Sequence, residues 1–80
     1  MLKFFLERVD GDDIVFAYLP EGDGGDMGTV IWDSKKNDAR VGSKAREDDY
    51  TIYARHLMKR LRDEFAEHGK LPESGEVAWY

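Results

Sequence analysis

The chain has 80 residues and a formal net charge of −5; 41% of its residues are apolar, 36% are charged and none is cysteine. This composition excludes an intrinsically disordered chain, disulfides, thiolate metal sites and cysteine nucleophiles, and no apolar run approaches the roughly 18 residues of a membrane-spanning helix. We therefore expect one folded cytoplasmic domain over residues 1–80 with a thin core and no membrane contact, and the acidic charge argues against a general nucleic-acid binder.

The first two predicted elements are the strands of a β-hairpin. Residues 2–9 alternate in hydrophobicity, and residues 14–19 are rich in β-branched and aromatic side chains. Asp10 and Gly11 between them are typical of a hairpin turn. A two-residue and a three-residue turn would bring opposite faces of the second strand beside the apolar side chains of the first. We expect the odd-length turn, which gathers these side chains on one face: Leu2, Phe4, Leu6, Ile14, Phe16 and Tyr18.

This register leaves a second apolar face on the hairpin. It carries Phe5, Val15, Ala17 and Leu19. One helix cannot cover both faces of a sheet, so either the long middle loop or another subunit must cover this one. The surplus face is the observation that predicts a homodimer.

Between the hairpin and the helix, the sequence predicts one strand and two flexible loops. Residues 20–28 contain Pro20 and four glycines, which favour a loop. Residues 29–32, TVIW, predict a third strand. Residues 33–48 show no sustained period and predict a second loop, with a short extra strand at residues 39–41 as an alternative.

Residues 49–68 carry the strongest periodic signal. Apolar side chains recur there at spacings of three and four, as in one amphipathic helix: Tyr50, Tyr53, Ala54, Leu57, Met58, Leu61 and Phe65. Asp49 is the expected N-cap, Gly69 is expected to end the helix, and His68 suits its negative end. The opposite helix face is basic, with Arg55, Lys59 and Arg62.

A turn and a last strand at residues 76–80 complete the predicted order β-β-β-α-β. We expect an α+β fold in which a small, mainly antiparallel sheet of three or four strands packs on the one amphipathic helix. The predicted core consists of Leu2, Phe4, Leu6, Ile14, Phe16, Ile31, Tyr53, Leu57, Leu61, Phe65, Val77 and Trp79.

A resemblance to known proteins lies in two segments, DYTIYARHLMKRL in the helix and LPESGEVAWY after it. They resemble the C-terminal half of small uncharacterised bacterial proteins with a tyrosine-led helix and a terminal turn and strand ending in aromatic residues. The resemblance covers about the last third of the chain. It implies a small bacterial domain of unknown function and names no activity.

Charge is segregated along the chain. Residues 1–33 carry a net charge of −6, residues 34–62 carry +5 and residues 63–80 carry −4. The basic centre can be neutralised within the fold, promote head-to-tail association or form a local positive face.

Two acidic segments offer carboxylates to a hard cation. One is the loop with Glu21, Asp23 and Asp26, which lacks the glycine and the terminal glutamate of an EF-hand. The other is the hairpin tip with Asp10, Asp12 and Asp13. We expect both to be solvated acidic loops and predict no metal site.

No residue pattern predicts catalysis or a cofactor. His56 and His68 lie too far apart on the helix to share a metal ion, and we expect structural roles for both. The serines Ser34, Ser43 and Ser74 lack the context of a nucleophile elbow. We therefore expect a protein that is not an enzyme.

Two surfaces carry the functional hypotheses. The favoured one is a non-enzymatic interaction module that forms a homodimer or binds another protein, through the residues Phe5, Val15, Leu19, Trp79 and Tyr80. The alternative is anion or nucleic-acid binding by the basic helix face, Arg55, Lys59 and Arg62, together with the middle loop. Against the alternative, Lys59 and Arg60 are spaced to pair with Asp63 and Glu64 on the helix surface.

Overall fold

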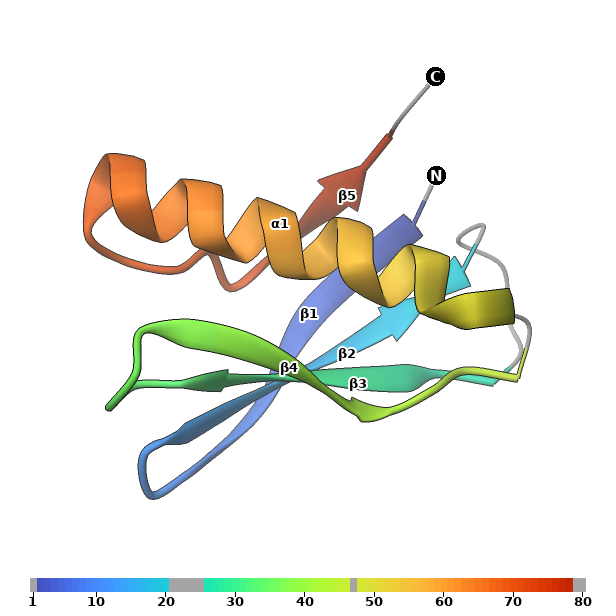
Figure 1. The fold of residues 1–80 in the computed structure, drawn as a ribbon, viewed down its shortest axis with the longest axis horizontal. Coiled ribbons are helices and arrows are strands. Elements are labelled where there is room, and N and C mark those ends of the chain that lie inside the picture. Colours follow the sequence, from blue (N-terminus) through green and yellow to red (C-terminus); the bar gives the residue numbers. More distant parts are fainter. Residues whose placement is uncertain (1, 21–25, 47, 79–80) are drawn as a thin grey trace.

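In the computed structural model, which describes residues 2–20, 26–46 and 48–78, a five-stranded antiparallel sheet packs against one helix (Figure 1). The elements in chain order are β1 (Leu2–Asp10), β2 (Asp13–Leu19), β3 (Gly28–Asp33), β4 (Asp38–Ser43), the 3₁₀ turn Asp49–Thr51, α1 (Ile52–His68) and β5 (Ser74–Val77). The strands lie in the order β4-β3-β2-β1-β5, so β5 returns after the helix to pair with β1. The predicted α+β class, with an antiparallel sheet on one helix, is confirmed.

The strand count differs from the prediction because of β4. Residues 33–48 were expected as a flexible loop, but Asp38–Ser43 pairs with β3, with Val41 opposite Val30 and Ala39 opposite Trp32. The observed order is therefore β-β-β-β-α-β. The last strand, Ser74–Val77, begins two residues before the predicted one, and residues 79–80 lie outside the described residues.

A β-bulge in β1 sets the register of the first hairpin. Asp10 pairs with Asp13 around a two-residue turn, in which Gly11 has a φ of 62°. The pairing shifts by one residue between Leu6 and Arg8, so β1 carries one extra residue there. Because of this extra residue, the apolar side chains in the N-terminal half of β1 lie on the same face of the sheet as those of β2. The predicted face is confirmed, while the predicted odd-length turn is wrong because the extra residue lies in the strand.

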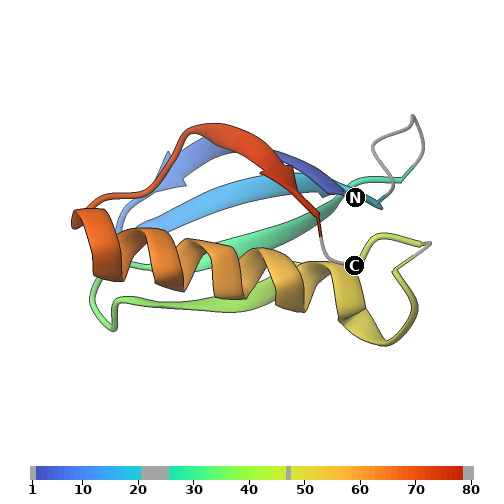
Figure 2. The ribbon, with the colours of Figure 1, turned by 90° about the horizontal axis from the view of Figure 1, so that it is seen from above.

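The hydrophobic core lies between this face and α1 (Figure 2). Its buried members are Leu2, Phe4, Phe16, Tyr18, Val30, Trp32, Ala39, Ala45, Ala54, Leu57 and Leu61. The ring centroids of Trp32 and Phe65 lie 5.1 Å apart, which joins β3 to the last turns of the helix. Ile31, a predicted core residue, lies on the opposite face of β3, because Val30 and Trp32 take the core positions.

The start of the helix also differs from the prediction. Tyr50 and Thr51 have φ angles of 60° and 55°, a left-handed conformation that is rare for residues other than glycine and unfavourable for β-branched ones. Tyr50 is 83% exposed, so it does not extend the apolar stripe. The α-helix proper begins only at Ile52.

Asp48, rather than the predicted Asp49, caps the helix. Its Oδ1 accepts a hydrogen bond from the Tyr53 N–H at 2.7 Å and its Oδ2 accepts one from the Ala54 N–H at 3.0 Å. The Tyr18 hydroxyl donates to the same Oδ2 at 2.7 Å, and its oxygen accepts the Ala45 N–H at 3.1 Å. Asp48 is fully buried, so these partners replace the water that its carboxylate loses. This cluster joins β2, the loop before the helix and the helix start.

The end of the helix follows the prediction. Gly69 has a φ of 71° and donates its N–H to the Phe65 carbonyl at 2.8 Å, which is the left-handed ending that glycine favours. His68 lies in the last turn, with Nε2 at 3.5 Å from a Glu64 carboxylate oxygen. After this turn the chain reverses, and the Glu73 carbonyl accepts the N–H of Leu6.

The Asp48→Ala substitution should destabilise the protein by about 3 kcal/mol. It removes a cap worth about 0.5–2 kcal/mol and leaves the buried Tyr18 hydroxyl without its acceptor, at a cost of about 1–3 kcal/mol. Urea unfolding followed by circular dichroism measures the loss. Asp49→Ala is the matched control, because Asp49 is exposed, and we expect a change below about 0.5 kcal/mol. Equal losses in the two variants would contradict the assignment of the cap.

Tyr18 should make stability fall at high pH. Burial raises the pKa of its hydroxyl to about 12, a rise that the Ala45 hydrogen bond opposes and the Asp48 carboxylate reinforces. In the unfolded chain this pKa is about 10, so between about pH 10 and pH 12 the folded state keeps a proton that the unfolded state has lost. The contribution of Tyr18 is thus complete below about pH 10, and about 3 kcal/mol of unfolding free energy is lost by about pH 12.

Urea unfolding of the wild type and of Tyr18→Phe across this pH range tests the effect. The difference between their free energies of unfolding should shrink by about 3 kcal/mol as the pH rises. Tyr50→Phe, at an exposed tyrosine, should follow the wild type. If the wild type and Tyr18→Phe lose stability in parallel as the pH rises, the Tyr18 hydroxyl is not the source of the pH dependence.

Candidate functional site

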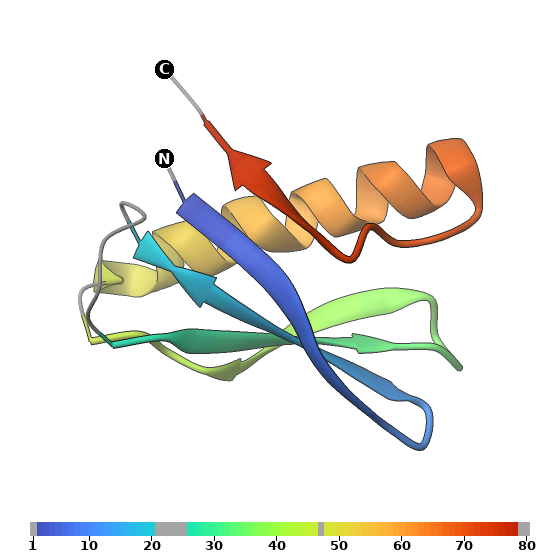
Figure 3. The same cartoon turned by 180° about the vertical axis from the view of Figure 1, so that it is seen from behind.

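Figure 3 shows the sheet face that α1 leaves uncovered, and the strand register places three of the five predicted interaction residues on it, Phe5, Val15 and Leu19. The strand register places Phe5 opposite Ala17, and Val15 opposite Ile31, on this face. Trp79 and Tyr80, the other two predicted members, lie outside the described residues.

Less of this face is open to solvent than the sequence pattern predicts. Val15 is 3% exposed and Ala17 is 1% exposed, although α1 packs on the other side of the sheet. Leu19 and Ile31 are half-buried, and Phe5 is 38% exposed. The middle of this face is therefore closed to solvent, and its exposed apolar surface is centred on Phe5.

Around Phe5 the surface forms a shallow depression of about 340 Å³ between β1, β2 and β5. Lys3 lies opposite Leu19 on one side and opposite Glu76 on the other. Within the described residues, the side chains of Lys3 and Glu76 form no ion pair. We call Lys3, Phe5, Leu19 and Glu76 the Phe5 patch.

The cations of the basic helix face are engaged in contacts within the chain. Lys59 Nζ lies 2.7 Å from an Asp63 oxygen, as the sequence spacing predicts. Arg62 Nε lies 2.6 Å from an oxygen of Asp38 in β4. Arg62, together with the N–H of Ala39, holds the pKa of Asp38 below its usual range.

Arg55 supports the strained turn before the helix. Its Nη2 donates to the Tyr50 carbonyl at 2.7 Å, and its Nε donates to the Thr51 carbonyl at 3.4 Å. Arg55 and Lys59 line one shallow depression together with Ile52 and His56, whereas Arg62 is not part of its lining and is paired with Asp38. Anion binding through this face stays a prediction.

The segregated charges of the sequence meet across the fold. Arg40 in β4 contacts Asp13 at 3.1 Å, Lys35 contacts Asp12 at 3.4 Å, and an Asp26–Arg46 pair lies at 3.1 Å. The basic centre thus pairs with the acidic N-terminal part, the first of the three alternatives. Each pair is solvent-exposed and contributes little to stability on its own.

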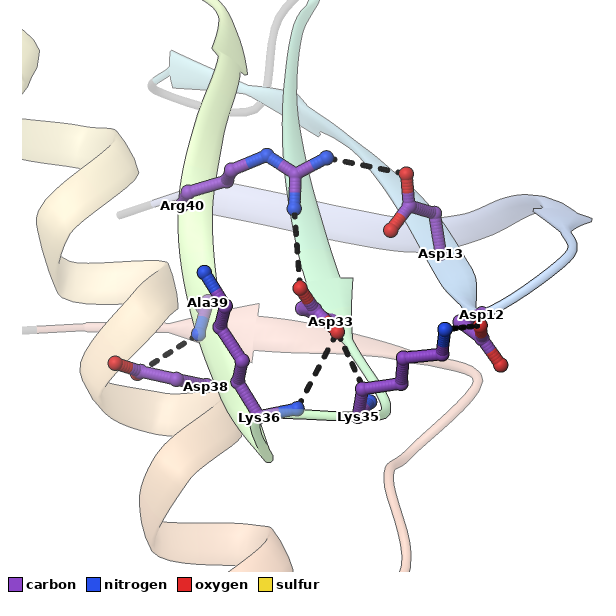
Figure 4. A network of polar contacts seen from close by, with 8 residues as sticks. All are labelled: Asp12, Asp13, Asp33, Lys35, Lys36, Asp38, Ala39 and Arg40. Carbon is purple, nitrogen blue, oxygen red and sulfur yellow. Dashed lines mark hydrogen bonds and ion pairs between the residues drawn. The ribbon is translucent and has the colours of Figure 1, made fainter.

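The acidic hairpin tip belongs to this polar network (Figure 4). The β1–β2 and β3–β4 turns lie side by side, and the Ser34 N–H donates to the Asp12 carbonyl at 2.9 Å. Asp33 accepts the N–H groups of Lys35 and Lys36 at 2.9 and 3.3 Å. Glu21 and Asp23 of the other acidic segment lie outside the described residues. Across residues 2–20, 26–46 and 48–78, no three acidic or histidine side chains gather as metal ligands.

A second apolar site lies on the helix side of the sheet, at the C-terminal end of α1. It is a groove of about 350 Å³ between the outer half of the first hairpin, β3 and the connection from α1 to β5. Its apolar wall consists of Leu6, Val9, Ile14, Phe16, Trp32, Phe65, Leu71 and Pro72. Its polar rim consists of Ser34, Asn37, Lys70 and Glu73. We call it the helix-end groove.

The sequence did not reveal this groove, because its walls come from five separate segments. The one local sign of the groove in the sequence is Leu71, an apolar residue next to Pro72 in the connection from α1 to β5, and its side chain is half-buried against the core.

The chain matched no protein-family model, no curated protein and no solved structure. Among the described residues, no helix is long and apolar enough to cross a membrane. The Phe5 patch and the helix-end groove are the two surfaces of the molecule from which we infer a function.

Proposed function

We propose that the protein is a non-enzymatic interaction module that forms a homodimer through the Phe5 patch. The observation that supports this is an aromatic side chain, Phe5, that is 38% exposed on a sheet face without a covering helix. Tyr18 and Asp38, whose pKa values are shifted, both hold structural contacts.

Burial of Phe5 supplies the apolar part of the interaction. Complete burial of a phenylalanine side chain contributes about 1.5–3 kcal/mol, and part of this remains to be gained. Leu19 lies on the same face, and the buried Val15 and Ala17 give the patch a packed floor. The patch is small, so a stable complex needs polar complementarity as well.

The charges of the patch favour a second copy of this chain as the partner. Lys3 and Glu76 lie opposite each other on β1 and β5, beside the exposed Phe5, and neither is ion-paired within the described residues. In a two-fold dimer the same patch meets itself, so that Lys3 of each copy can face Glu76 of the other. One cation and one anion flanking an apolar centre make this surface self-complementary.

Charge reversal tests the dimer. We expect a micromolar dissociation constant, so light scattering at about 50 µM should give a dimer mass for the wild type. Lys3→Glu and Glu76→Lys should each be monomeric, because each places like charges across the interface. An equimolar mixture of the two variants should recover the dimer mass, since one copy then carries only negative and the other only positive patch charges.

Lys36→Glu is the matched control, an equal charge change on the exposed β3–β4 turn, and should leave the mass of the dimer unchanged. Circular dichroism checks that every variant is folded. A monomer mass for the wild type, or a mixture that stays monomeric, would overturn the proposal.

A further inference from the structure

The helix-end groove lies on the other side of the sheet from the Phe5 patch, and its lining is typical of a small-molecule site. Ligand pockets are lined mainly by apolar side chains, with a few polar groups that fix the orientation of the ligand, and this groove has that arrangement. Its volume of about 350 Å³ equals that of about a dozen water molecules. It therefore suits a molecule of about a dozen non-hydrogen atoms.

The wall of the groove is suited to an aromatic or branched apolar group. Trp32 and Phe65 line it with their rings tilted by 46° at a centroid distance of 5.1 Å, so a third ring can pack against them edge to face. Leu6, Ile14 and Leu71 are only half-buried here, so they gain burial when the groove is filled.

The rim carries one charge of each sign. Lys70 and Glu73 both line the groove from the connection between α1 and β5, and neither side chain is ion-paired within the described residues. A ligand with only a carboxylate would meet Glu73 as well as Lys70, and a ligand with only an ammonium group would meet Lys70 as well as Glu73. A zwitterion satisfies both side chains with charge-assisted contacts.

We propose that the helix-end groove binds a small zwitterion with an apolar side chain, of the chemical class of the apolar α-amino acids. The apolar group lies against Trp32 and Phe65, the carboxylate faces Lys70 and the ammonium group faces Glu73. Phenylalanine, with about twelve non-hydrogen atoms, matches the volume of the groove.

Three probes that share one ring separate the contributions. L-Phenylalanine, 3-phenylpropanoate and 2-phenylethylamine are titrated into the full chain, and binding is followed by the NMR shifts of the Trp32 indole N–H and of the backbone amides around the groove. L-Phenylalanine should bind about tenfold more tightly than either singly charged probe. Lys70→Glu should weaken L-phenylalanine binding about tenfold while leaving 2-phenylethylamine binding unchanged or stronger.

Lys3→Glu is the matched control, since it makes the same charge change on the opposite face of the sheet and should leave L-phenylalanine binding unchanged. It also separates the two proposals, because it is expected to break the dimer. The ligand proposal is overturned by three probes of equal affinity, by L-phenylalanine binding that survives Lys70→Glu, or by no shifts around the groove at about 10 mM L-phenylalanine.

Discussion

The buried carboxylate of Asp48 determines where the helix lies. It accepts hydrogen bonds from the backbone N–H groups of Tyr53 and Ala54 in the first turn of α1. It also accepts one from the hydroxyl of Tyr18 in β2, the central strand of the sheet. Because Asp48 is fully buried, losing any one partner would leave a polar group without water or a hydrogen bond. The carboxylate therefore fixes the start of α1 over one strand, and the apolar stripe then packs Leu57 and Leu61 on the core face. It also offsets part of the cost of the left-handed turn before the helix.

Elements encoded by local periodicity were predictable from the sequence. The apolar stripe of α1 and its end at Gly69 depend on residues a few positions apart in the sequence, so the sequence pattern predicts where they lie in the structure. β4 was predicted only as an alternative, a short strand at residues 39–41, because its strand character comes from pairing with β3, while its own sequence offers only Ala39 and Val41 as alternating apolar residues. The cap was assigned to Asp49 instead of Asp48 for a similar reason: adjacent aspartates look alike locally, and the choice depends on a tyrosine thirty residues away.

The candidate sites were only partly predictable, because exposure depends on tertiary structure. Alternation placed Phe5 and Val15 on the second face, but it did not show that Val15 is covered by its neighbours while Phe5 is not. The sequence correctly predicted which side chains of the hairpin share a face, but it attributed this register to an odd-length turn. In the structure, the register results from a bulge between Leu6 and Arg8. The helix-end groove depends on where α1 stops relative to the first hairpin, which no single segment encodes.

The twist of the sheet connects the two surfaces. A twisted sheet diverges from a straight helix with distance from their closest contact, so a helix anchored at Asp48 leaves the outer hairpin uncovered near Ile14. Phe5 and Leu6 are neighbours in β1 on opposite sides of the sheet, with Phe5 in the patch and Leu6 in the groove. Their side chains point away from each other, so a second copy of the chain and a small ligand can occupy the two surfaces at the same time.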